Sequence, residues 1–72
     1  MSTATTTQQV YRLLAVAERN ETDARVARAD IARFGRLISK PEILAAKVAE
    51  CEKKAARHDR AAAKAREALK GM

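Results

Sequence analysis

The sequence predicts an all-α fold: an antiparallel two-helix coiled-coil hairpin, which two copies can combine into a four-helix bundle. Apolar residues recur at alternating spacings of three and four in both halves of the 72-residue chain, a pattern typical of a coiled-coil seam. Signals that end one helix and start another meet near the middle. When the chain is folded there, the numbers of opposed seam residues add up to 78 or 79 throughout. We therefore predict a single domain over residues 1–72.

The first helix is predicted over about residues 6–34, after a flexible tail of residues 1–5. Thr5 with Gln8, or Thr6 with Gln9, has the spacing of an N-terminal capping box. The seam positions of this half are apolar with a single exception, an asparagine. In chain order they are Val10, Leu13, Ala17, Asn20, Ala24, Ala27, Ile31, Phe34 and Ile38.

A turn is predicted over residues 35–39. Gly35 can adopt the positive φ at which helices commonly end. Ser39 and Glu42 have capping-box spacing, and Pro41 suits the first turn of the helix that follows. One helix is therefore expected to end and another to begin within a few residues.

The second helix is predicted over about residues 40–70, with Gly71 closing it. Its seam again has one polar member, His58, which the index sum places opposite Asn20. The seam residues are Pro41, Leu44, Val48, Cys51, Ala55, His58, Ala62, Ala65 and Leu69. A buried polar layer of this kind sets the register of a coiled coil.

Opposite charges beside the seam also predict the register. Three pairs are expected to join the helices: Asp30 with Lys47, Asp23 with Lys54, and Arg28 with Glu52. A slip by one heptad would separate them, although exposed pairs add little to stability.

The sequence offers few large apolar side chains for a core, because 17 of the hydrophobic residues are alanines. A single hairpin would bury little apolar area, so either helix propensity holds a monomer or the hairpin associates further. The second alternative is favoured, since each helix of a lone hairpin buries only one stripe. The candidate interface is an alanine flank beside the seam, formed by Tyr11, Leu14, Ala32, Ala45, Ala49, Ala56 and Ala63.

The net charge of +6 is unevenly distributed. The face opposite the alanine flank, here called the basic face, carries eight Lys and Arg residues against three acids, a net +5, whereas the alanine flank carries four bases against five acids. Candidate contacts for an anionic partner are Arg12, Arg19, Arg33, Lys47, Lys54, Arg57 and Lys64. Four of these form a stripe toward the chain ends: Arg12, Arg19, Arg57 and Lys64. Such a stripe suits nucleic-acid phosphates or an acidic protein surface.

These patterns favour a small non-enzymatic regulator or adaptor that binds another protein, or its own copy, through a helical face. Nucleic-acid binding through the phosphate backbone and a role as a structural assembly component are the alternatives. No catalytic constellation or phosphate-binding loop is recognisable, so we expect no enzyme activity, small-molecule substrate, cofactor or metal. One cysteine, no membrane-length apolar run and no signal-peptide pattern favour the cytoplasm. A small Ala- and Arg-rich chain also fits a bacterial or phage accessory protein.

Overall fold

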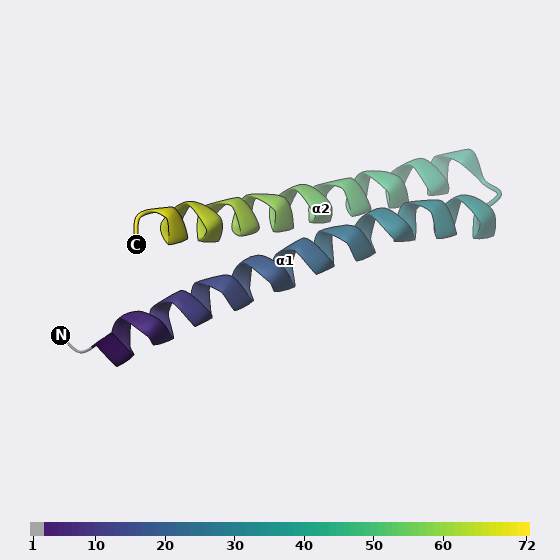
Figure 1. The fold of residues 1–72 in the computed structure, drawn as a ribbon. Helices are drawn as coiled ribbons and strands as arrows, with labels where there is room; N and C mark the ends of the chain where they lie inside the picture. Colours follow the sequence, from purple (N-terminus) through teal and green to yellow (C-terminus); the bar gives the residue numbers. More distant parts are fainter. Residues whose placement is uncertain (1–2) are drawn as a thin grey trace.

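The computed structural model describes the backbone of residues 3–72 and the side chains from residue 6 onward. Two helices, α1 (Thr3–Leu37) and α2 (Pro41–Lys70), pack along each other in opposite directions (Figure 1). The described part of the chain contains no strand. The all-α hairpin predicted from the sequence is therefore confirmed.

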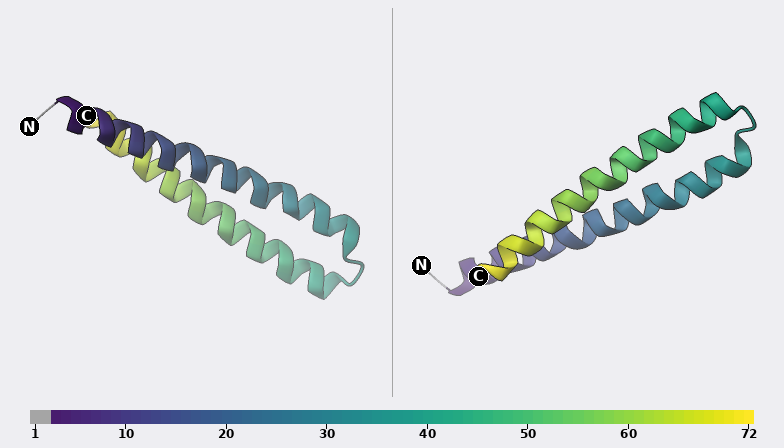
Figure 2. Two further views of the ribbon diagram at one scale, coloured as in Figure 1. Left: turned by 90° about the horizontal axis from the view of Figure 1, so that it is seen from below. Right: turned by 90° about the horizontal axis from the view of Figure 1, so that it is seen from above.

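The hairpin is a slender rod of 58 × 15 × 12 Å. Its radius of gyration is 16.7 Å, against ~11 Å for a compact chain of this length. The start of α1 and the end of α2 lie at one end, which we call the open end (Figure 2). The helices separate toward the open end in Figure 1 and toward the turn in Figure 2, so they twist about each other.

Within the described side chains, all buried residues occupy predicted seam positions. They are Ala17, Ala24, Ala27, Cys51, Ala55, Ala62 and Ala65. The larger seam residues, such as Leu13, Phe34 and Leu44, are only half-buried. Pro41 is exposed, so the seam of α2 begins at Leu44 and the assignment of Pro41 to it is wrong.

The depth of burial follows from the geometry of two helices. Only methyl-sized side chains fit between closely spaced backbones, and a longer side chain projects past the line of contact toward solvent. The accessible surface is 5620 Å², whereas a compact folded monomer of this mass exposes ~4,400 Å². The hairpin therefore leaves more surface open than a globular domain of its size.

The first helix starts earlier than the sequence predicts. Residues 3–5 are helical, so a flexible tail is wrong for them, while residues 1 and 2 lie outside the described residues. Adding a residue to the end of a nucleated helix costs little free energy, so the helix extends beyond the caps expected at Thr5 and Thr6.

The turn is caused by the proline and not by the glycine. Gly35 lies inside α1, and neither it nor any other described glycine has a positive φ. The last turn of α1 is closed by a hydrogen bond from Ile38 N to Phe34 O, at 2.9 Å. Lys40 is extended, with φ −81° and ψ 118°, as expected of a residue before proline. The predicted helix end at Gly35 is therefore wrong by about one turn.

The cap of α2 also differs from the prediction. Lys40 is the N-cap residue and makes no side-chain capping bond, so the Ser39–Glu42 capping box does not form. That box would need Ser39 at the N-cap, one residue earlier. Pro41 lies in the first turn as expected. Gly71 ends the helix, but with the right-handed φ of −76°.

Gly35→Ala is expected to stabilise the hairpin by about 0.5–1 kcal/mol, because alanine loses less entropy in a helix than glycine does. A Cβ at residue 35 would meet nothing within 4 Å. Thermal unfolding followed by circular dichroism should show a midpoint several degrees higher, with Gly71→Ala, just beyond the helix, as a control of smaller effect. A lower midpoint for Gly35→Ala would mean that residue 35 needs a left-handed conformation.

Candidate interaction surfaces

The alanine flank is an open surface in the isolated hairpin. Tyr11 is 68% exposed, while Leu14 and Ala56 are half-buried. The remaining members are exposed: Ala32, Ala45, Ala49 and Ala63. Because these residues come from both helices, the flank could only be formed by folding the hairpin.

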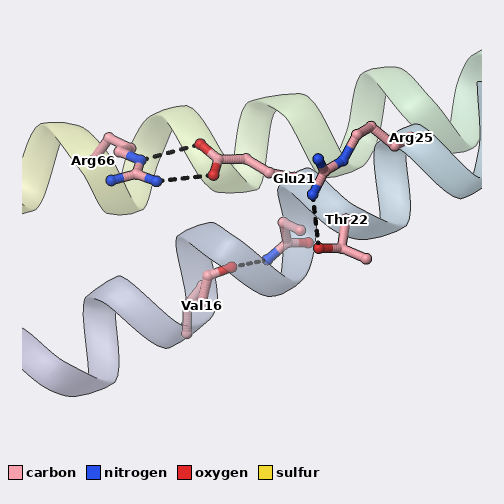
Figure 3. Close-up of polar contacts among 6 residues, drawn as sticks. Val16, Glu21, Thr22, Arg25 and Arg66 are labelled. Atoms are coloured by element: carbon pink, nitrogen blue, oxygen red, sulfur yellow. Dashed lines mark hydrogen bonds and ion pairs between the residues drawn. The ribbon is translucent and has the colours of Figure 1, made fainter.

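Two ion pairs cross from α1 to α2 along this flank. Arg66 makes two hydrogen bonds to the carboxylate of Glu21: Nε donates to Oε2 at 3.0 Å and Nη2 donates to Oε1 at 2.8 Å (Figure 3). Arg28 donates to both carboxylate oxygens of Asp59. The second pair lies at a hollow of about 370 Å³ whose lining includes Ile31 and Ala56. The middle of the flank is therefore polar, with apolar surface on both sides.

None of the three predicted charge pairs forms. Asp30 instead pairs with Arg33 at 2.6 Å and Lys47 with Glu50 at 3.6 Å, each within its own helix. Arg28 binds Asp59 in place of Glu52. Lys54 makes no ion pair with any described residue.

The direction in which side chains lean explains the difference. Helical side chains tilt toward the N-terminus of their helix. In this hairpin those of α1 lean toward the open end and those of α2 toward the turn. A residue of α1 therefore meets a partner on α2 that lies closer to the open end than the residue directly opposite. Both observed pairs agree with this direction. The residue numbers of each pair add up to 87, whereas those of directly opposed seam residues add up to 78 or 79.

Each pair changes the acidity of its carboxyl group. The hydrogen bonds from Arg66 hold the pKa of Glu21 below its ordinary value, and those from Arg28 lower the pKa of Asp59. The same bonds raise the pKa values of the two arginines. Both carboxylates are thus favoured in the charged form that joins the helices.

The predicted contact between Asn20 and His58 forms in the seam, but both residues are half-buried and not buried as predicted. His58 Nδ1 lies 2.7 Å from Asn20 Oδ1, and Asn20 Nδ2 donates to Val16 O at 2.8 Å. Since the amide nitrogen of Asn20 is the donor to the backbone, its oxygen accepts, and His58 Nδ1 must carry the donated proton. The Oδ2 atom of Asp23 lies 4.0 Å from the same nitrogen. Among the described residues no buried side-chain polar atom lacks a hydrogen-bond partner.

The basic face contains two kinds of cation. Arg33 and Lys47 are held by acids of their own helices, and each lies 6.0 Å from the centre of the Phe34 ring. The other five candidates make no ion pair with a described residue: Arg12, Arg19, Lys54, Arg57 and Lys64. The free cations include all four members of the stripe near the open end.

Sequence reasoning missed that the basic face is also apolar. On this face Val16 is 40% and Val26 54% exposed. Leu37 and Ile43, near the turn, are also exposed there. At the open end, Leu13 and Val16 of α1 line a groove of about 320 Å³ together with the alanines of α2 and Lys64. The signal was available, because aliphatic residues occupy heptad positions beside the seam on this side.

Other kinds of site are not found in the described residues. Their His, Cys, Asp and Glu side chains form no group of three or more that could hold a metal ion. The described chain has no helix with the length and hydropathy needed to cross a bilayer. Comparisons with models of protein families, with curated proteins and with solved structures find no match. Any functional assignment must therefore be argued from the surfaces.

The crossing ion pairs predict loss of stability in acid. Because the pKa values of Glu21 and Asp59 are lowered in the folded hairpin, their contribution is present above the unfolded values and disappears as the pH falls through the folded ones. Combining Glu21→Gln with Asp59→Asn should lower the melting midpoint at pH 7 and flatten its decline below about pH 4.

Glu52→Gln with Glu67→Gln provides a charge-matched control, since neither residue has an ion-pair partner on the other helix among the described residues. Melting curves measured by circular dichroism at pH 7 and pH 2.5 compare the variants. If both double variants changed the pH dependence equally, net charge alone would account for the effect and the crossing pairs would not.

Proposed function

We propose that this chain is a small non-enzymatic adaptor or regulator that binds protein through its alanine flank. A second copy of the hairpin is the simplest occupant, and the product would be a four-helix bundle. In that assembly Tyr11 and Leu14 would act as the large apolar contacts, and the alanines would allow close approach of the helices.

The observation that carries the proposal is the shortage of buried apolar surface. Among the side chains that the structure describes, only alanines and Cys51 are buried, and no larger one is enclosed. The accessible surface of 5620 Å² exceeds that of a compact monomer by ~1,200 Å². A typical partner in a stable complex covers ~800 Å². The excess is thus large enough to supply one whole interface.

Charge supports the choice of face for a second copy. The alanine flank carries four bases and five acids, so two such surfaces do not repel each other. The basic face carries eight bases and three acids, and two copies meeting there would bring like charges together. The ion pairs on the flank already satisfy two of its acids.

Leu14→Glu is expected to disrupt self-association, because it places a charge among the apolar residues of the proposed interface. Size-exclusion chromatography with light scattering should give about twice the 7.9 kDa chain mass for the unaltered protein. The variant should run as a single chain.

Ala15→Glu is the matched control, since Ala15 is the exposed next residue and points away from both faces. It should leave the mass unchanged. A single-chain mass for the unaltered protein across micromolar concentrations would contradict self-association through the flank.

Nucleic-acid binding is the second candidate function, supported by the free cations of the basic face. Arg12 and Arg19 are seven residues apart on α1, as are Arg57 and Lys64 on α2, which corresponds to about 10.5 Å along each helix. Rows of cations at such spacing can follow a phosphate backbone without reading bases.

Arg12→Glu combined with Arg57→Glu should abolish a salt-sensitive shift of a labelled duplex in a native gel if this candidate is correct. Lys53→Glu with Arg60→Glu changes the charge equally at heptad positions farthest from the seam, outside both faces, and should leave the shift in place. Equal loss in both double variants would mean that only net charge attracts the duplex.

A further inference from the structure

The groove at the open end has an apolar floor formed by both helices. Leu13 and Val16 come from successive turns of α1, and Ala61, Ala65 and Ala68 lie along the facing side of α2. Val16 is 40% exposed and Leu13 half-buried. Among the described residues none that is acidic lines this groove, and the single charged one is Lys64.

Cations border the floor on both helices. By heptad position Arg12 and Arg19 lie beside the α1 edge of the floor. Lys64 lines the groove itself, and Arg57 lies one heptad from it toward the turn, where it lines the adjoining hollow. All four are exposed and without an ion-pair partner among the described residues. The basic border ends toward the turn, where the adjoining hollow is lined by Asp23 and Asp30 as well as Lys54 and Arg57.

We propose that this groove binds an amphipathic helix of a partner protein whose apolar stripe is flanked by Asp or Glu. The inference rests on the proposed protein-binding function and adds to it a second surface with a different partner. A helix lying in the groove would complete a three-helix bundle. Acidic residues spaced seven apart on the partner helix would match the spacing of the cations on both sides, about 10.5 Å.

Charge complementarity distinguishes this occupant from others. A second copy would present the same cations, and the flank acids Glu21 and Asp59 are already bound to arginines. A nucleic acid would neutralise the cations but leave the Leu13 and Val16 surface in contact with water. None of the described residues that line the groove is aromatic and could stack on a base. An acidic amphipathic helix uses both the floor and the border.

The test uses a synthetic fluorescein-labelled peptide of three heptads, with Leu at positions a and d and Glu at e and g. Fluorescence anisotropy would measure its binding to the full chain in physiological salt. We expect Arg57→Glu with Lys64→Glu to weaken binding by at least about tenfold, because attraction becomes repulsion at the groove border. Val16→Glu should weaken it similarly by placing an acid on the floor.

The charge-matched control, Lys53→Glu with Arg60→Glu, should change the affinity less than twofold. Lys53 and Arg60 are also seven residues apart on α2, but on the ridge away from the groove. Circular dichroism would verify that each variant keeps the helix content of the unaltered chain. A variant that loses it would be replaced by Arg57→Gln with Lys64→Gln, for which a weaker but specific loss is expected.

Three results would overturn the inference. One is equal binding by the groove and control variants, and another is equal affinity for a peptide with Lys in place of Glu. The third is tighter binding of a duplex oligonucleotide or of vesicles rich in phosphatidylglycerol with the same sensitivity to Arg57 and Lys64. The groove variants leave Leu14 intact, so the light-scattering mass reports on the alanine flank separately and either surface can fail alone.

Discussion

The narrow contact between two helices is the constraint on which the rest of this structure depends. A pair of rods can enclose only what fits between their backbones, and here that is a line of alanines and one cysteine. Each larger side chain of the seam extends to one side and stays half-exposed. The same geometry that makes the hairpin simple therefore leaves apolar residues on both of its faces. Association with another helix is the physical remedy for that exposure.

Charge gives those two faces different characters. On the alanine flank, bases and acids nearly balance, and arginines tie the two helices together through Glu21 and Asp59. On the basic face, acids pair with Arg33 and Lys47 toward the turn, whereas the cations near the open end have no ion-pair partner among the described residues. A nearly neutral face tolerates a copy of itself, whereas a positive face favours a negatively charged partner. The two proposed interactions are therefore compatible on one molecule.

The sequence predicted the features that depend on periodicity and missed those that depend on side-chain direction. The seam apart from Pro41 and the contact between Asn20 and His58 were correct, because heptad spacing determines which positions meet, although the polar pair is half-buried and not buried. The helix end at Gly35 was wrong, because Pro41 restricts Lys40 more strongly than an optional glycine restricts the chain. The ion pairs were wrong, because index sums ignore the tilt of the Cβ atoms. The groove was not predicted, because the distribution of charge does not reveal that Val16 forms part of an apolar floor on the basic face.

Register connects the core to both surfaces. Alanine layers are alike, so a slip of one heptad would cost the central seam little packing. It would, however, move Asn20 from His58 to a position opposite Cys51 or Ala65, where its side chain could not form the same bond. It would also separate Arg28 from Asp59 and Glu21 from Arg66. The polar contacts thus select one alignment among several of similar apolar burial. In that alignment Arg12 is about level with Lys64, and Arg19 with Arg57, so a partner helix would meet two cations on each side, whereas a slip of one heptad would leave only one such pair level.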